Sequence, residues 1–273
     1  MTIVLDIGSY QTLIGLFDNS DNLVKKISLK TSIDYLKFLR QLEEIIVKDA
    51  TLTEELSGGI IGISARFDIN QDFVFECLGL PWKNIPLVAD IEKITKCPLS
   101  LQNNVSLSAF YESISHYKNQ AKKILYLSIG NTIKDCLIIN NQFNSITKID
   151  HNNIMIEKNG RAIEWDNLIS GRSIIERFSD SAKNIKNKDI WRSYSQELAQ
   201  GLWQLNALYQ PDVFIIGGTI GNYFNQYQEF LNQELEKYIL PILPLPNIVK
   251  ATKPFSNALF GGNLLLKQNF LVQ

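Results

Sequence analysis

Two adjacent asparagines, Asn103 and Asn104, stand between a short apolar run and a segment with helical spacing. Asparagine caps helix N-termini well, because its side-chain oxygen accepts a hydrogen bond from a backbone N–H group. Its amide also binds ligand hydroxyl groups, but it has almost no basicity and cannot take a proton from them. The pair therefore indicates a helix start, a hydroxyl-binding site, or both at once.

Glycines follow strand-like runs at several points of the chain: in Asp6-Ile7-Gly8, at Gly130 and in Gly217-Gly218. A glycine in such a turn lets the backbone approach a phosphate or a nucleotide closely. A plain hairpin turn explains the first segment equally well, so that segment is weak evidence for nucleotide binding when taken alone, and the strand followed by Gly217-Gly218 is only moderately specific.

Apolar and alternating runs predict the elements that must position these residues in the first half of the chain. Strands are expected at residues 2–8, 13–18, 23–29, 59–64, 72–77 and 99–102, and helices at residues 33–47, 87–95 and 104–117. Short polar turns join the first strands into a meander. The helical spacing at residues 33–47 is carried by Leu36, Leu39, Leu42 and Ile46.

The second half of the chain repeats this plan. Strands are expected at residues 123–129, 132–139, 142–147, 212–216 and 248–251, and helices at residues 168–178, 189–209, 223–240 and 256–270. Two meanders, each followed by helices, predict a duplicated α/β fold with two lobes. The polar stretch at residues 113–122 is the expected boundary between them.

The composition restricts the possible functions. The chain has 27 Lys and Arg residues against 28 Asp and Glu residues, without a dense basic stretch, so nucleic-acid binding is not expected. No apolar run approaches the ~20 residues that cross a bilayer, and the N-terminus does not resemble a secretion signal. The cysteines, Cys77, Cys97 and Cys136, are expected to be buried thiols, which favours a reducing, cytoplasmic location without membrane association.

A series of stretches in a fixed order resembles the ROK (repressor, open reading frame, kinase) family of sugar kinases. They are residues 6–12, 62–68, 79–87, 97–112, 125–136, 211–220 and 257–262. The resemblance implies the ribonuclease H-like, duplicated two-lobe fold of actin-like ATPases and hexokinases. The implied lobes are residues 1–115, with the C-terminal helix 256–273 packing back on them, and residues 116–255. The family's activity is ATP-dependent sugar phosphorylation, with ATP and Mg²⁺ as the implied cofactors.

The resemblance also implies roles for particular residues. It puts Asn104 at the position of the family's catalytic Asp, which takes the proton of the attacking sugar hydroxyl. Sugar-contacting positions are held by Asn103, Asp166, His151 and Arg66. Nucleotide-binding positions are held by Asp6, Gly8, Gly130, Gly217 and Gly218.

Several positions depart from the family's pattern. A sugar-binding Asn is replaced by Gly79, a sugar-binding Glu by Lys148, and a Pro-Gly that opens the sugar pocket by Ala65-Arg66. The long Arg66 side chain is expected to fill or charge that pocket. His151 matches a zinc ligand, but the family's cysteine loop is missing, and one His without Cys cannot form a tetrahedral site. No zinc is expected.

These departures favour a ROK homologue impaired in catalysis that keeps weak sugar or nucleotide binding. The alternative is an active ATP-dependent hexose or N-acetylhexosamine kinase in which Asp6, Asp68 or Asp166 serves as the base. A ROK repressor is the third hypothesis, and it is set aside because those proteins carry a winged helix ahead of the first strand. The expected partners are a small sugar or nucleotide and, as an open question, a second copy in a homodimer.

Overall fold

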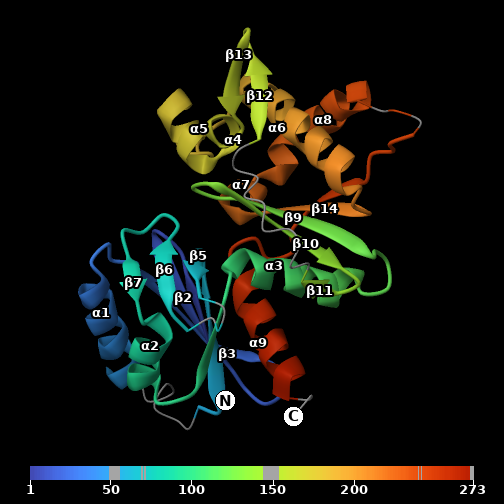
Figure 1. Ribbon diagram of the computed structural model, residues 1–273. Coiled ribbons are helices and arrows are strands. Elements are labelled where there is room, and N and C mark those ends of the chain that lie inside the picture. The colour runs from blue at the N-terminus through green and yellow to red at the C-terminus, as the bar shows by residue number, and fades with distance from the viewer. Residues whose placement is uncertain are drawn as a thin grey trace. The chain divides into compact units, whose positions relative to one another are not determined.

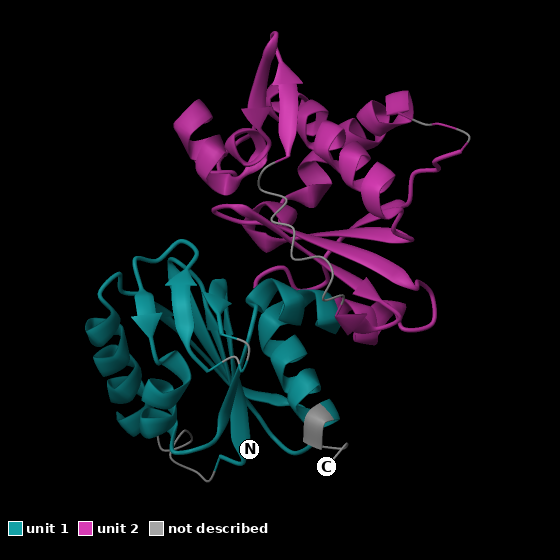
Figure 2. Cartoon of the chain, viewed as in Figure 1, with its two compact units in different colours: residues 1–111, 256–273 teal, residues 112–255 magenta. Residues whose placement is uncertain are grey.

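The computed structural model describes residues 1–48, 56–68, 70, 72–143, 154–238, 240 and 242–270. The chain divides into two compact units, residues 1–111 with 256–273 and residues 112–255 (Figure 2). Each unit is an α/β structure with its own buried core, and each is described by itself.

The first unit is built on a five-stranded sheet with the order β3-β2-β1-β4-β8 (Figure 1). Its strands are β1 (Thr2–Ile7), β2 (Gln11–Phe17), β3 (Leu23–Lys30), β4 (Gly58–Ile63) and β8 (Leu99–Gln102). The first three strands form the expected antiparallel meander, and β4 and β8 run parallel to β1. Central strands are apolar because both faces are covered; in β1 Asp6 is the one position that is only partly buried.

Helices and a second sheet complete this unit. The helices are α1 (Tyr35–Lys48), α2 (Leu87–Thr95), α3 (Asn104–Glu112) and α9 (Asn257–Phe270). The small antiparallel sheet contains β5 (Ala65–Phe67), β6 (Val74–Cys77) and β7 (Lys83–Ile85). Helix α9 contacts β1 and β4, so the last described residues of the chain share a core with its first strand.

The apolar face predicted for the first helix was partly wrong. Leu36 is 61% exposed, whereas Phe38, Leu42 and Ile46 are buried. The face is set by Phe38, whose ring centroid lies 4.8 Å from that of Trp82. An aromatic pair buries more surface than Leu36 offers, so the helix turns Phe38 toward the core.

The second unit repeats the plan of the first, with the sheet order β11-β10-β9-β14-β15. Its strands are β9 (Lys123–Ile129), β10 (Ile133–Ile139), β11 (Gln142–Phe143), β14 (Val213–Gly217) and β15 (Asn247–Lys250). Three strands are again antiparallel neighbours, and β14 and β15 run parallel to β9. The predicted duplication is therefore visible in the topology.

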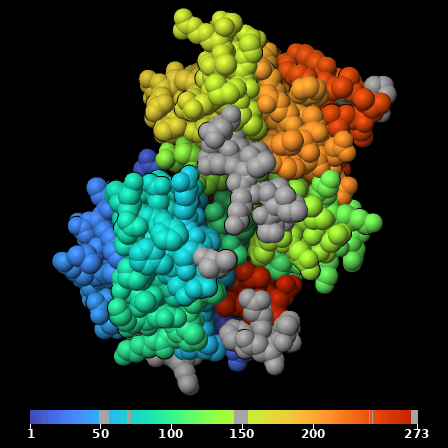
Figure 3. All heavy atoms as spheres, in the orientation of Figure 1, coloured from blue at the N-terminus to red at the C-terminus, as the bar shows by residue number. Residues whose placement is uncertain are grey.

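Five helices belong to the second unit within the described residues. They are α4 (Asp166–Ile169), α5 (Gly171–Phe178), α6 (Lys188–Tyr209), α7 (Gly218–Gly221) and α8 (Phe224–Leu235), followed by a 3₁₀ turn (Glu236–Tyr238). A π-helical turn (Ser113–Tyr117) continues α3. A separate hairpin, β12 (Met155–Lys158) and β13 (Arg161–Glu164), projects from the surface of the unit (Figure 3).

Some sequence predictions need correction. The helix expected at residues 168–178 is two helices, because Ser170 adopts an extended conformation and caps α5 by accepting from the Ser173 amide. The helix expected to reach residue 240 ends at Leu235 in the 3₁₀ turn. Strands β5, β7, β12 and β13 were not predicted; each has three or four residues, and a charged side chain interrupts its apolar pattern. The strand expected to reach residue 147 lies outside the described residues beyond residue 143.

Every helix among the described residues is too short or too polar to cross a membrane.

Candidate functional site

Asn104, the first residue of α3, is held at both ends of its side chain. Its Nδ2 donates to Asp6 Oδ1 at 3.1 Å, and its Oδ1 accepts from Ser64 Oγ at 3.0 Å. The main chain of Gly62 makes room for this arrangement, because a Cβ there would lie 3.3 Å from the Asn104 Cβ. Ser64 was not singled out from the sequence, where a serine just after a strand is an unremarkable residue.

The helix cap is formed by Asn103 and not by Asn104. Asn103 Oδ1 accepts from the Val105 amide at 3.0 Å, and its carbonyl accepts from the Leu107 amide at 3.1 Å. These two bonds are those of an N-cap residue. The two asparagines therefore have separate tasks: Asn103 starts the helix, and Asn104 joins it to the end of β1 and to Ser64.

Asp6 carries the most perturbed carboxyl group of this arrangement. Burial raises its pKa to about 6, and the hydrogen bond from Asn104 opposes that rise. Desolvation disfavours the charged form, whereas a donor favours it. Near neutral pH, Asp6 is therefore a carboxylate whose proton affinity lies close to the range used by general bases.

The raised pKa of Asp6 predicts a pH-dependent stability. The folded value is about 6 against an ordinary value of 3.8, so the folded chain binds more protons than the unfolded chain between these values. Stability is then expected to fall as the pH rises from about 4 to about 6, by at most roughly 3 kcal/mol. Partial exposure of Asp6 will reduce this amount through solvent screening.

Urea unfolding of the wild type and of Asp6→Asn at several pH values between these limits measures the effect. The difference in unfolding free energy between the two proteins should change progressively with pH, because asparagine does not titrate. A stability difference between them that stays constant over the whole pH range would contradict the assignment.

Asp68 and Arg66 are engaged on the surface of the first unit. Asp68 Oδ1 accepts from the amides of Phe73 at 2.9 Å and Asp72 at 2.8 Å, and these backbone bonds lower the pKa of Asp68. The side chain of Arg66 is 72% exposed, and its Nη1 lies 3.9 Å from Glu76 Oε2. That Arg66 fills or charges the sugar pocket stays a prediction.

Asp166 is a buried residue of the second unit whose two carboxylate oxygens bind different parts of the chain. Its Oδ1 accepts from the Ile133 amide at 2.6 Å, and its Oδ2 accepts from Arg172 Nη2 at 2.9 Å. Burial raises the pKa of Asp166, and these donors oppose the rise. The carboxylate therefore fastens the start of β10 to the α4–α5 segment.

The amides of the two phosphate-turn glycines are used inside their own turns. Gly8 N donates to the Gln11 carbonyl at 3.0 Å, and Gly130 N donates to the Thr132 carbonyl at 3.1 Å. At Gly8 a Cβ would lie 2.8 Å from that Gln11 oxygen, so this turn requires glycine for its own closure. Neither glycine amide is available to a phosphate in this conformation.

Gly217, the last residue of β14, and Gly218, the first residue of α7, each require glycine for a different reason. Gly218 has a φ of 75°, and a Cβ there would lie 2.7 Å from the Ile129 carbonyl oxygen. At Gly217 a Cβ would lie 1.9 Å from the hydroxyl oxygen of Tyr126, which is buried. The space beside Gly217 is therefore filled by Tyr126, a residue that the sequence patterns had marked only as part of a strand.

The predicted residues thus gather in two places. Asp6, Asn103 and Asn104 lie together in the first unit with Ser64. In the second unit Gly130 is joined to the α4–α5 segment, where Asp166 also lies, because Gly130 O accepts from the Gly171 amide at 2.7 Å. His151 and Lys148 lie outside the described residues. Within the described ranges, no group of three His, Cys, Asp or Glu side chains is placed to hold a metal ion.

A family model described as "ROK family" matches residues 2–269. The chain belongs to the ROK family. This confirms the resemblance inferred from the motifs, and it places the two units in the duplicated actin-like ATPase and hexokinase fold.

Sugar kinases are among the known proteins that are similar to the chain. The fructokinase of Streptococcus mutans is 21% identical over 267 residues, which cover 89% of this chain and 88% of that protein. The N-acetylmannosamine kinase of Vibrio cholerae is 22% identical over 277 aligned residues, which cover 89% of this chain and 93% of that protein. A ROK glucokinase of Streptomyces griseus, solved with glucose and AMPPNP, superimposes with a TM-score of 0.81 at 17% identity, over 98% of this chain and 99% of that one.

Proposed function

We propose that this ROK protein is a sugar-kinase homologue impaired in phosphoryl transfer, which retains at most weak binding of a hexose or an adenine nucleotide. The observation that carries the proposal is the side chain of Asn104, bound to Asp6 through Nδ2 and to Ser64 through Oδ1. Transfer to a sugar hydroxyl needs a group that accepts its proton. An amide cannot do so, and both ends of this amide are already occupied.

The sugar-binding positions support the same proposal. Asn103 uses its side-chain oxygen to cap α3, and Asp166 uses both carboxylate oxygens within the second unit. A sugar that bound these residues would have to displace existing hydrogen bonds. Since a hydrogen bond exchanged for another contributes little net free energy, we expect weak sugar binding.

The nucleotide positions fit a bound triphosphate poorly. The amides of Gly8 and Gly130 are committed within their turns, and Tyr126 fills the space beside Gly217. A phosphate at either turn would depend on the remaining amides. ATP and Mg²⁺ are the cofactors that the family relationship suggests, and the chain is expected to hold them weakly.

An active kinase with an altered site is the second candidate, and the state of Asp6 favours it. Of the three carboxylates considered as replacement bases, Asp68 and Asp166 are tied to backbone amides. Asp6 accepts one hydrogen bond through Oδ1 from Asn104, and its pKa is raised to about 6. If turnover exists, Asp6 is therefore the carboxylate that we expect to accept the proton.

A coupled ADP-release assay separates the candidates. The protein is tested with ATP, Mg²⁺ and, in turn, glucose, fructose, mannose and N-acetylated hexosamines. We expect turnover at or near background, at least about 100-fold below the roughly 1 s⁻¹ that marks the lower end of kinase rates. Turnover of that order or faster, abolished by Asp6→Asn, would establish the second candidate instead.

A further inference from the structure

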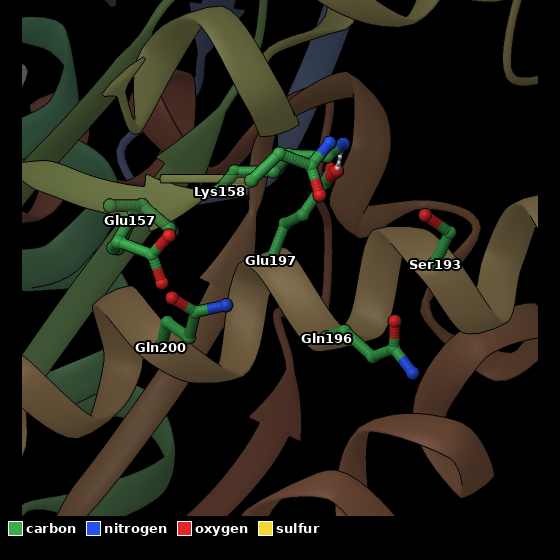
Figure 4. A pocket seen from close by; sticks show the side chains of 8 residues that line it. Glu157, Lys158, Ser193, Gln196, Glu197 and Gln200 are labelled. Carbon is green, nitrogen blue, oxygen red and sulfur yellow. Dashed lines mark hydrogen bonds and ion pairs between the residues drawn. The ribbon is translucent and has the colours of Figure 1, made fainter. Parts of the chain in front are cut away.

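A polar pocket of about 270 Å³ lies in the second unit, and its lining contains none of the predicted site residues. The β12–β13 hairpin forms one wall and helix α6 forms the other (Figure 4). It is lined by Ile156, Glu157, Lys158, Asn159, Ser193, Gln196, Glu197 and Gln200. Ile156 is the only apolar side chain of this lining, and it is 1% exposed.

The helical wall is a single polar stripe. Gln196 and Glu197 lie three and four residues after Ser193 and four and three residues before Gln200, so these four residues lie on one face of α6. Such a stripe normally points to solvent. Here the hairpin covers part of it, because Ile156 and Lys158 share the face of β12 that is turned toward α6.

Fixed ion pairs hold the two walls together. Lys158 Nζ of the hairpin donates to Glu197 Oε1 of the helix (Figure 4). Arg177 of α5 donates to both oxygens of Glu197 at 2.6 and 2.7 Å. The carboxylate of Glu157 accepts from the Gly160 amide at 2.6 Å, which closes the hairpin turn. The lining holds the two carboxylates and one ammonium group, and Arg177 binds Glu197 from outside the lining, so the pocket presents no net positive charge to a ligand.

Uncommitted polar groups remain on the helical wall. Within the part of the chain that the structure describes, the side chains of Ser193 and Gln200 make no hydrogen bond. Gln196 Nε2 reaches Glu234 Oε1 only at 3.4 Å. Hydroxyl and amide groups both donate and accept, and the Lys158 ammonium group has N–H groups beyond the one that Glu197 binds.

We propose that this pocket binds a neutral polyhydroxylated ligand of monosaccharide size. Neighbouring hydroxyls of such a ligand donate and accept at once, as Gln196 and Gln200 do, whereas an anion would find no net positive charge. The volume lies below the roughly 300–1,000 Å³ of pockets for drug-sized molecules, so a small ligand fits. With no aromatic ring in the lining for stacking, we expect a dissociation constant on the order of 1–10 mM.

The test uses D-glucose and sulfate as probes and the ¹H–¹⁵N resonances of the glutamine side-chain amides of the full-length protein. Gln200→Leu assigns one resonance and removes one ligand group. Gln226→Leu, on an exposed position of α8, is the matched control. Up to about 100 mM glucose is added, well above the expected dissociation constant.

Saturable glucose-dependent shifts of the Gln196 and Gln200 amides are expected in the wild type and in Gln226→Leu, with at least about 5-fold weaker binding in Gln200→Leu. The absence of shifts, or shifts that Gln200→Leu leaves unchanged, would overturn the proposal. A saturable response to sulfate alone would overturn it as well, because the site would then prefer an anion. Kinase activity is not part of this readout, so the result can be interpreted whether or not the protein phosphorylates sugars.

Discussion

The Asn104→Asp protein is expected to phosphorylate hexoses no faster than the wild type, although it restores the carboxylate of the family's catalytic position. Asp6 Oδ1 lies 3.1 Å from the atom that becomes the second carboxylate oxygen. Two carboxylates this close do not both ionise, and they share one proton with one pKa strongly raised. Because Asp6 already has a pKa of about 6, the shared proton should persist at neutral pH.

A second reason lies in the lost donor. Asn104 Nδ2 supplies the hydrogen bond that opposes the rise in the Asp6 pKa, and an ionised Asp at residue 104 cannot supply it. The coupled ADP-release assay with glucose, ATP and Mg²⁺ measures the outcome. A gain of about 100-fold or more over the wild type, the lower range of general-base catalysis, would contradict the prediction.

An exchange of the two residues provides the matched control. The double variant Asp6→Asn/Asn104→Asp keeps one carboxylate and one amide at the same separation, so it should fold as stably as the wild type. If proton sharing is the obstacle, this variant should be more active than Asn104→Asp alone. If both stay at background, the committed glycine amides of the phosphate turns are the dominant defect.

The Glu197→Ala protein is expected to lose about 2–3 kcal/mol of stability, because the substitution leaves two partly buried cations without their carboxylate partner. The Glu197 side chain is 5% exposed, and it accepts from Arg177 and from Lys158, which is 34% exposed. Truncation would also leave a cavity beneath the hairpin. The free energy of unfolding in urea is the measurement.

Glu176→Ala serves as the control, since Glu176 is an exposed residue of α5, one position before Arg177. It should change stability by no more than about 0.5 kcal/mol. Glu197→Gln keeps an acceptor for one cation, so its loss of stability should lie between those of Glu176→Ala and Glu197→Ala. If Glu197→Ala costs less than about 1 kcal/mol, the ion pairs are compensated by solvent, as exposed pairs are.

Much of the fold was predictable from local patterns. The runs that became β1, β4 and β9 are apolar and β-branched, and α2 and β8 begin and end where the sequence places them. Their signals are strong because each element is long enough for its periodicity to show, or is bounded by Pro or Gly. The fixed order of the motifs identified the ROK family, which the family model confirms.

Short or irregular elements were beyond this reasoning. The β12–β13 hairpin has strands of four residues each, and its Lys158 reads as an ordinary surface residue. Its contact with Glu197 joins residues 39 positions apart. Such a pair leaves no local signal, because neither a period nor a turn motif connects the two residues.

The candidate site shows the same division. Sequence alone determined that an amide stands at residue 104 and that the chain belongs to a sugar-kinase family. Only the tertiary structure decided that Asn103 caps the helix while Asn104 binds Asp6, 98 residues away, and Ser64. The residue type fixes which atoms can donate or accept a proton. The partner those atoms meet depends on strand order and register, which long-range packing sets.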